Sequence, residues 1–544
     1  MEFKKAAVVL AVSLGAYVSA RVAAGGYDIA LVGLWLTSIL VFCGAWFDGR
    51  LIILDRGKIR IWLGIGLLAL LPVIVRVSLF DMSRIHGDDV ISAWISATTD
   101  FSTANFFGGF PLSKVDWMGQ FPAVYFVIQR GIVEVLGRNM AAIKWSVQPY
   151  VWLVGVGLYL NGKLLGGKSV GIATVVLYAF FWPAIYLETL GLHFVSSTAV
   201  FLLFLHRLLL FSRRQTNRNA AAMGMLTGAG LLFYIISYIA VPMAGLMLLK
   251  KHNLKLAVAA VIGGWLVAGP FLTYAVRWDN YFVSRAKQVD YLNGTWSKIR
   301  DDGKVKKLSE LTENYRRVWR AMYIDGIGGH GGYNFGRLGL LSGFNLGLLA
   351  VGLVTTGVIF RRDSRWGWVL LAVVMSYLAM VLSIPPPAFH RFSLAFPLLI
   401  LIAASTFRYL ERGKAGQGWI IMAVTVALFA GDNLQKIGPV LAGEGNNRDI
   451  EVVQETLNLY PGRDTYIAAF PGFHLEKVWY FMAPEFQKRT VSAAYHWNLQ
   501  NHMNPDEKYV YILTLPRDYA QQFKAADPKG NIVQFNDQYS LFVN

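Results

Sequence analysis

Charged residues are scarce in this chain. They make up 15% of its 544 residues, whereas hydrophobic residues make up 55% and the mean hydropathy is +0.44. Soluble globular domains usually carry about 25% charged residues, so this composition excludes an ordinary soluble protein. Cysteine is nearly absent as well. The single thiol, Cys43, excludes an intramolecular disulfide and a cysteine-based metal site.

Long apolar runs are abundant, and they indicate a polytopic α-helical membrane protein. A helix needs about 20 mainly apolar residues to cross the hydrocarbon layer. The sequence predicts about 13 spans, at residues 6–22, 28–47, 61–80, 145–161, 169–187, 193–211, 220–235, 236–249, 254–275, 338–360, 367–384, 392–408 and 418–432. The first run resembles a signal peptide, but a second run follows almost at once, so we expect the first to be retained as a span.

The net charge of +18 does not indicate nucleic-acid binding. The basic residues lie mostly in short loops between the apolar runs, as the positive-inside rule predicts for cytoplasmic loops. With Lys4 and Lys5 in the cytoplasm, every loop assigned to that side has an excess of Lys and Arg. This topology places residues 81–144, residues 276–337 and the C-terminal domain on one outer face.

Two stretches depart from the pattern of simple spans. Residues 120–139 have helical periodicity but contain Gln129, Arg130 and Glu134, so we expect a helix on the outer surface rather than a span. Residues 220–249 are divided into two short helices that meet near Ser237 and Tyr238. Interrupted helices are tolerated at membrane depth where neighbouring protein or a water-filled cavity satisfies the freed backbone groups.

The composition changes near residue 436. Strand-like "TYIAAF", "YVYILTL" and "NIVQFNDQYSLFVN" alternate with turn residues and predict a small α/β domain over 436–544. The expected organisation is therefore two N-terminal spans in residues 1–50, a transmembrane catalytic domain in 51–435, and this extracytoplasmic domain.

Two adjacent aspartates follow the third apolar run in "RIHGDDVISAW". Carboxylates are costly near hydrocarbon and are usually kept there for a function. A helix that begins near Asp88 would stabilise its carboxylate through the N-terminal dipole. One interpretation is a helix cap at a membrane exit. The other is catalytic: Asp88 as a general base for an acceptor hydroxyl, with Asp89 orienting it, raising its pKa or helping to hold a divalent cation.

This acidic pair, in the first large outer loop of a multi-spanning protein, resembles the GT-C superfamily of glycosyltransferases, specifically the protein O-mannosyltransferase and lipid A aminoarabinose transferase family. Further similarities follow in the same order along the chain. They are the surface helix "QFPAVYFVIQRGIVEVLGRNMAAIKW", the Gly-rich "AAMGMLTGAGLL", the loop "MYIDGIGGHGGYNFGR" and the late "PPPAFHRFSLAFPLL". The resemblance covers about residues 60–410.

The chain departs from the family pattern at two points. The Lys that often follows the Gly-rich helix is missing, which leaves one family phosphate contact in doubt. The Lys-Pro-Pro of the aminoarabinose transferases is also absent, which argues against that particular activity.

A polyprenyl-phosphate donor, which the resemblance implies, needs cations at the outer membrane face. The planar fork of Arg suits phosphate, so Arg391, beside His390, is the first candidate ligand, and a snorkelling interfacial arginine is the alternative. Arg138 and Arg337 are further candidates.

The glycine-rich loop 326–336 contains His330, Tyr333 and Asn334. Its backbone could approach an anion or close over a substrate. It could equally be a flexible connector. Glu188 and His193, at the outer ends of two spans, could line an acceptor cavity or serve as caps and anchors.

The resemblance implies an inverting glycosyltransferase that moves a sugar from a polyprenyl-phosphate carrier to a glycan, lipid or protein acceptor on the extracytoplasmic side. We expect a bacterial inner (plasma) membrane location, contact with membrane lipid, no nucleic acid, and no firm cofactor requirement beyond a divalent cation at Asp88 and Asp89, if any. The alternatives are a transporter or flippase of lipid-linked saccharides and a non-catalytic accessory subunit on the same scaffold.

Overall fold

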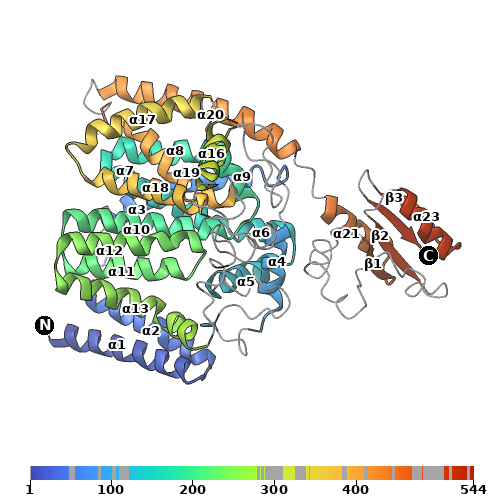
Figure 1. Cartoon of the computed structure of the whole chain (residues 1–544), viewed down its shortest axis with the longest axis horizontal. Coiled ribbons are helices and arrows are strands. Elements are labelled where there is room, and N and C mark those ends of the chain that lie inside the picture. The colour runs from blue at the N-terminus through green and yellow to red at the C-terminus, as the bar shows by residue number, and fades with distance from the viewer. Residues whose placement is uncertain are drawn as a thin grey trace.

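The computed structural model has a bundle of helices and, beyond one end of it, a small sheet (Figure 1). The structure describes residues 2–47, 56–83, 87–100, 106–108, 122–278, 282, 287, 310–324, 339–341, 343–382, 389–409, 415–443, 448–468, 481, 508–513, 517–535 and 539–544.

Each of the predicted apolar runs forms a helix of the bundle. These helices are α1 (Glu2–Ala23), α2 (Ile29–Trp46), α3 (Arg56–Val77), α7 (Gln148–Gly166), α8 (Lys168–Phe180), α9 (Trp182–Thr189), α10 (Phe194–Arg213), α11 (Asn217–Leu231), α12 (Ala240–Lys251), α13 (Leu254–Arg277), α17 (Phe344–Phe360), α18 (Arg365–Val381), α19 (Ala395–Ala404) and α20 (Ala415–Gly443). Short 3-10 segments also occur, namely η2 (Ile235–Ile239), η3 (Phe389–Phe392) and η4 (Ser405–Arg408).

Six of the described helices are long and apolar enough to cross a membrane by length and composition. They are parts of α1, α2, α3, α10, α13 and α20. The pair α8 and α9, bent by 61°, would make a seventh span. Three other apolar helices, at Phe344–Phe360, Arg365–Val381 and Ala395–Arg408, are shorter, and the predicted number of 13 spans stays a prediction.

The expected break between residues 220 and 249 is present. The 3-10 segment η2 separates α11 from α12, and the Ser237 hydroxyl donates to the carbonyl oxygens of Gly230 (2.6 Å) and Tyr234 (2.8 Å). The side chain therefore satisfies backbone carbonyls that the interrupted helix leaves free.

The Gly-rich helix α11 packs directly on the backbone of α13. A Cβ added at Gly224 would lie 1.8 Å from the Ala260 carbonyl oxygen, and one at Gly228 would lie 2.5 Å from that of Gly264. Only glycine permits such an approach, which is typical of helix pairs in membranes. The glycines that contribute to the family resemblance thus have a packing role here.

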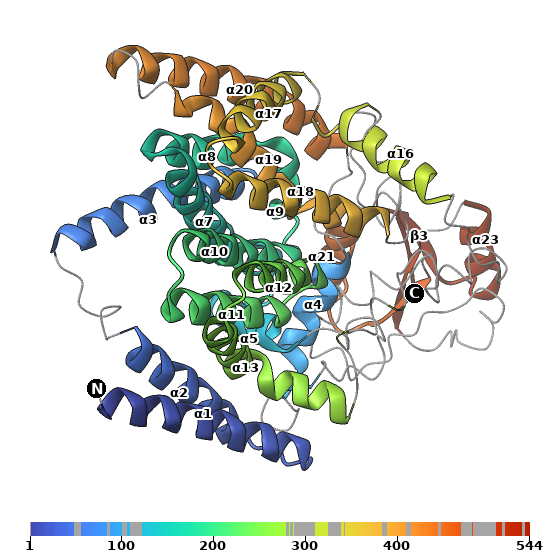
Figure 2. The same cartoon turned by 60° about the vertical axis from the view of Figure 1, so that its left-hand side comes forward.

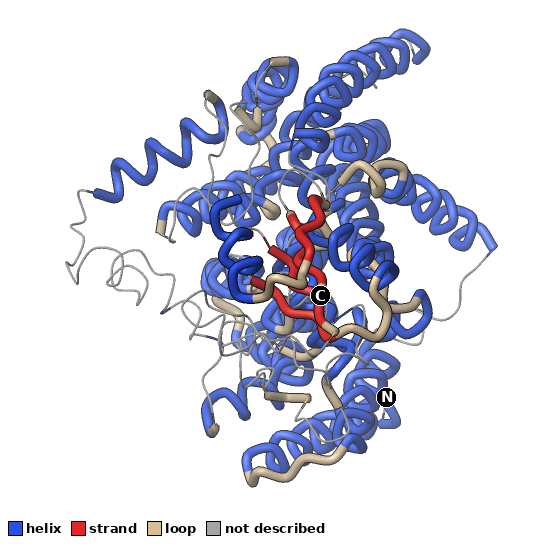
Figure 3. The backbone as a smooth tube through the Cα atoms, turned by 90° about the vertical axis from the view of Figure 1, so that its right-hand side faces the viewer, coloured by secondary structure: helices blue, strands red, loops and turns tan. Residues whose placement is uncertain are grey.

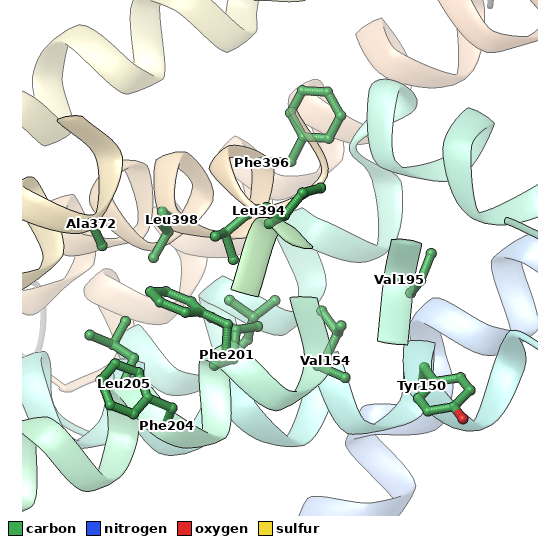
Figure 4. Close-up of a cluster of buried hydrophobic side chains, with 14 of the residues drawn as sticks. Tyr150, Val154, Val195, Phe201, Phe204, Leu205, Ala372, Leu394, Phe396 and Leu398 are labelled. Atoms are coloured by element: carbon green, nitrogen blue, oxygen red, sulfur yellow. The ribbon is translucent and has the colours of Figure 1, made fainter. Parts of the chain in front are cut away.

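The core of the bundle is aliphatic and aromatic. Figure 4 shows Phe201 and Leu205 of α10 beneath Leu394 and Leu398, which come from the start of α19. All four side chains are fully buried. Between helices that lie in a bilayer, such contacts stabilise by close van der Waals packing, and here they hold the two halves of the chain together.

Three helices lie across one end of the bundle: α4 (Gly87–Thr98), α5 (Val124–Leu136) and α6 (Met140–Trp145). Figures 1 and 2 show them on the side of the bundle where the sheet lies, opposite the end where the chain begins. A fourth helix outside the bundle, α16 (Glu310–Tyr323), packs on the end of α18, where Asn314 donates to the Val381 carbonyl oxygen (3.3 Å).

The C-terminal region is the predicted small α/β module. It contains α21 (Arg448–Leu459), β1 (Asp464–Ala468), β2 (Tyr509–Leu513), α23 (Arg517–Ala526), β3 (Asn531–Gln534) and β4 (Ser540–Val543). The sheet, red in Figure 3, has the order β1-β2-β4-β3. Strand β1 pairs with β2 in parallel, whereas β4 is antiparallel to both β2 and β3. The last strand-like stretch of the sequence is thus two strands.

A single hydrophobic cluster joins this module to the three end helices. It contains Val90 and Ala93 of α4 together with Val453 of α21 and Val510 of β2, all of them buried. The C-terminal module therefore packs against the helix that carries the acidic pair.

Candidate functional site

The acidic pair lies in the first turn of α4. Asp88 and Asp89 are the second and third residues of this helix, as the sequence predicted. The Asp89 side chain is fully buried, whereas the Asp88 side chain lies outside the part of the structure that is described. The unpaired backbone N–H groups of a first helical turn favour negative charge there.

A network of neutral hydrogen bonds holds α4 against α5 and α6. The Gln129 amide nitrogen lies 3.2 Å from the Ser92 hydroxyl and 3.3 Å from the Ser146 hydroxyl, and the Ser96 hydroxyl donates to the Gln129 amide oxygen (2.6 Å). The Ser92 hydroxyl in turn donates to the backbone carbonyl of Asp89 (2.9 Å). These four polar side chains are fully buried. Such a satisfied network fixes the orientation of α4.

Gln129 corrects one step of the sequence interpretation. It was one of three polar residues that indicated a surface helix over 120–139. The helix α5 exists and Arg130 and Glu134 face outward as an i,i+4 ion pair (2.6 Å), but Gln129 points to the opposite side and is fully buried. A single polar residue on a helix does not reveal which face it occupies when its partners are distant in sequence.

Beside this network lies an aromatic–histidine cluster formed by Tyr125, His193, Phe194, Tyr234 and His390. The ring of His193 lies 5.7 Å from that of Tyr125 and 5.5 Å from that of Tyr234, while His390 stacks on Phe194 at 4.6 Å. The cluster therefore connects α5, the start of α10, the region of η2 and the 3-10 turn η3.

Burial raises the pKa of Tyr125 well above its usual range, and the nearby charge of Asp89 adds to this effect. The phenol is therefore a neutral group that can donate or accept a hydrogen bond next to the acidic helix. Tyr234 is held in place by Ser197, whose hydroxyl accepts from the Tyr234 N–H (2.7 Å) and donates to its carbonyl oxygen (3.0 Å).

The candidate phosphate ligands fall into three groups. Arg391, largely buried with 8% of its surface exposed, follows His390 in η3 and so lies beside the aromatic–histidine cluster. Arg138 donates to the Ala97 carbonyl oxygen (3.3 Å) at the far end of α4. That carbonyl is eight residues from Asp89, or about 12 Å along the helix. The last phosphate candidate, Arg337, lies outside the described residues, and so do His330, Tyr333 and Asn334 of the possible substrate loop.

Lys144 was not predicted and holds the chain just before α4. Its ammonium group donates to the Phe80 carbonyl oxygen, the Ser83 carbonyl oxygen (2.5 Å) and the Ser83 hydroxyl (2.7 Å). Burial lowers the pKa of Lys144 to about 8, against a smaller opposing effect of Asp81. Three acceptors match the three donors of an ammonium group, so the protonated form fits this site.

Glu188 has a structural partner rather than an open position in a cavity. Its carboxylate forms a buried ion pair with Arg76 (2.7 Å) and accepts from the Tyr178 hydroxyl (2.5 Å). Arg76 also donates to the carbonyl oxygens of Tyr178 and Ala179. The group ties α3, α8 and α9 together, and it agrees with the anchoring alternative.

No group of three or more His, Cys, Asp or Glu side chains that could hold a metal ion occurs among the residues that the structure describes. The Asp88 side chain is outside that part of the chain, so a divalent cation at Asp88 and Asp89 stays a prediction.

Comparison with known proteins gives a similarity of fold. No family model matches the chain, and no curated protein matches its sequence. The crystal structure of ArnT (lipid A aminoarabinose transferase) from Cupriavidus metallidurans bound to undecaprenyl phosphate is similar, with a TM-score of 0.55 and 12% identity over 88% of this chain and 97% of that chain. Its apo state gives a TM-score of 0.53 with the same identity and the same coverage.

The apo form of an oligosaccharyltransferase from Archaeoglobus fulgidus gives a TM-score of 0.49 at 12% identity, over 83% of this chain and 69% of that chain. The similarity to ArnT confirms the resemblance that the sequence motifs indicated, at the level of fold: this chain has a membrane-protein fold like that of a glycosyltransferase from the GT-C group.

Proposed function

We propose that this protein is an integral-membrane glycosyltransferase that moves a sugar from a polyprenyl-phosphate carrier to an acceptor hydroxyl, with inversion at the anomeric carbon. The observation that carries the proposal is the acidic first turn of α4, whose Asp89 is buried near Tyr125 of the aromatic–histidine cluster, in a chain with a fold like that of ArnT. The similar ArnT structure has undecaprenyl phosphate bound, which supports a polyprenyl-phosphate partner here.

The proposed reaction assigns one role to each element. The Asp88 carboxylate accepts the proton of the acceptor hydroxyl as its oxygen attacks the anomeric carbon. The bond between that carbon and the phosphate oxygen breaks, and polyprenyl phosphate leaves as a monoester with one more negative charge. Arg391 binds the phosphate, because a guanidinium can donate two parallel hydrogen bonds to it.

Asp89 is the partner of the base in this mechanism. Its burial, and the bond from Ser92 to its backbone carbonyl, fix the first turn of α4 on which both acids lie. A carboxylate so close to Asp88 favours protonation of the base once it has accepted the acceptor's proton. The site is proposed to face the extracytoplasmic side of a bacterial inner membrane, with the module over 436–544 on the same side.

The first test compares wild type with Asp88→Asn and with Glu134→Gln, a control that removes an exposed carboxylate from the neighbouring helix. Each purified protein is supplied with a panel of radiolabelled polyprenyl-phosphate sugars and a membrane extract as acceptor. Transfer and donor binding are measured separately. We expect Asp88→Asn to lose about 10²- to 10⁴-fold in transfer rate, the usual contribution of a general base, and to keep donor binding.

Equal transfer by wild type and Asp88→Asn would remove Asp88 from the mechanism. If the protein bound the donor and moved it across vesicle membranes without transferring its sugar, the transporter alternative would be favoured instead. For the phosphate contact, Arg391→Gln should weaken donor binding at least tenfold, whereas Arg362→Gln, in the loop between α17 and α18, should not.

A further inference from the structure

The two N-terminal helices have no role in the proposed reaction, yet they are joined to the outer loop that carries it. Figure 2 shows α1 and α2 side by side next to α13 and away from α3. Near the end of α1, the Val22 carbonyl oxygen accepts from the indole N–H of Trp278, which lies just after α13 (2.9 Å). The helix pair is thus fixed to α13 rather than to its neighbour in sequence.

Trp35 of α2 makes the central contact. Pro270 lies inside α13 and has no N–H, so the carbonyl of Leu266, four residues earlier, lacks its helical partner. The Trp35 indole N–H donates to the carbonyl oxygens of Leu266 and Val267, both at 3.1 Å. An unsatisfied carbonyl in a membrane interior is costly, so Trp35 supplies the donor that the proline removes.

The same indole also holds part of the outer loop. Its ring lies 5.9 Å from Phe106, 6.0 Å from Phe107 and 5.5 Å from Phe271 of α13. The three phenylalanine rings lie 5.2–5.6 Å from one another in edge-on arrangements. Such pairs add about 0.5–1.5 kcal/mol each beyond the area they bury.

A second contact connects the same two parts of the chain. Tyr27, in the turn between α1 and α2, forms a side-chain hydrogen bond with the backbone of Phe106 and lies close enough to Asp100 to sense its charge. Asp100 lies two residues after the end of α4. The N-terminal helices therefore reach the loop at two points within ten residues of the acidic helix.

We propose that Trp35 is a positioning residue and that α1 and α2 act as a clamp on the outer loop, which restrains the C-terminal side of α4. The Gln129 network fixes α4 against α5, and Trp35 fixes the chain that follows α4 against α13. The catalytic consequence rests on the proposed function, whereas the restraint itself does not.

The test measures hydrogen–deuterium exchange of the full-length protein in detergent, in peptides covering residues 87–108 and 262–275. Three variants are compared with wild type. Trp35→Leu removes the ring contacts and the donor, whereas Trp35→Phe removes the donor and keeps a smaller aromatic ring. Trp46→Leu is the matched control, because Trp46 lies at the other end of α2, stacks on Phe42 and donates to the Asn217 carbonyl oxygen (3.3 Å).

We expect Trp35→Leu to increase exchange at least tenfold in both peptides. Trp35→Phe should increase it mainly in residues 262–275, and Trp46→Leu should change neither peptide. Unchanged exchange of residues 87–108 in Trp35→Leu would overturn the proposal, and so would an equal increase in Trp46→Leu, since the effect would then be a general loosening of α2.

Transfer assays separate this proposal from the proposed function. If wild type transfers sugar, Trp35→Leu should lower kcat about tenfold with donor binding unchanged, and Trp35→Phe should restore most of it. If wild type transfers nothing but the exchange pattern is as expected, the clamp stands and the glycosyltransferase proposal fails.

Discussion

Two buried carboxylates of this protein, Glu188 and Asp89, lie in helices that are held in place in different ways. Glu188 is neutralised between Arg76 and Tyr178, in a group that ties three helices together. Asp89 lies in a helix that neutral hydroxyls and an amide hold in place, and the network reaches it through its backbone carbonyl. A permanent ion pair suits a structural joint, because it fixes the charge. The network around α4 fixes its helix through neutral side chains and a backbone carbonyl.

The largest effect should come from breaking the ion pair. Glu188→Leu leaves the Arg76 guanidinium buried without its counter-charge, and loss of one partner of such a pair costs about 3–5 kcal/mol. We expect the unfolding temperature in detergent to fall steeply. The double variant Arg76→Met with Glu188→Leu should recover most of the loss. A single variant as stable as wild type would show that the pair is not a joint.

A smaller effect should come from the neutral network. Gln129→Leu nearly keeps the size of the side chain but removes its hydrogen bonds to three serine hydroxyls, each of which still donates to a backbone carbonyl. The expected cost is about 0.5–1.5 kcal/mol for each bond lost. Here we expect transfer to fall more than stability does, because α4 loses its orientation while the bundle is unaffected. The measurement is kcat beside the thermal midpoint. If kcat falls only as far as the loss of folded protein explains, the network has no positioning role.

Lys144 sharpens the comparison because its charge depends on pH. Its pKa of about 8 lies below the ordinary value of 10.5. Above pH 8 the folded protein loses a proton that the unfolded chain keeps until about 10.5, so this group's contribution to the unfolding free energy rises with pH over that window. Its hold on Phe80 and Ser83 weakens over the same range.

We therefore expect transfer to fall as pH rises through about 8 while stability does not fall with it. Lys144→Arg, which stays charged, should not show this fall in transfer at alkaline pH. If transfer by Lys144→Arg still fell over this pH range, the fall would have to be assigned to another group.

The smallest effect should come from the exposed ion pair of Arg130 and Glu134. At an i,i+4 spacing on a surface helix, such a pair contributes about 0.3–0.5 kcal/mol. Glu134→Gln should shift the thermal midpoint by less than a degree or two and leave transfer unchanged. A large effect would mean that burial does not explain why the ion pair of Arg76 and Glu188 contributes more than this exposed pair does.

Patterns within short stretches of the sequence predicted much of this fold. The apolar runs predicted the bundle helices, the residues around Ser237 predicted the break between α11 and α12, and strand-like stretches predicted the C-terminal sheet. The acidic pair could be placed at a helix start because Gly87 precedes it. Each of these signals lies within a few residues of the feature that it predicts.

The contacts that build the site could not be predicted in this way. His193 meets Tyr125 and Phe194 meets His390 across many residues of sequence, and Arg76 meets Glu188 112 residues later. Lys144 was hidden because a single lysine between apolar residues is usually a surface anchor. One signal was available in principle: a polar residue on the apolar side of a helical pattern, as Gln129 is in α5, indicates a buried partner elsewhere.

The bend between α8 and α9 has a consequence for the order in which the chain is assembled. The first amide of α9, that of Trp182, donates to the Asn433 side-chain oxygen (3.0 Å), and Asn433 is held in turn by the Asn345 amide (3.1 Å). During synthesis, Trp182 enters the membrane some 250 residues before its acceptor. The bent segment must therefore wait, incompletely bonded, until α20 has been made, and a ribosome that stops early releases a chain that quality-control proteases can recognise.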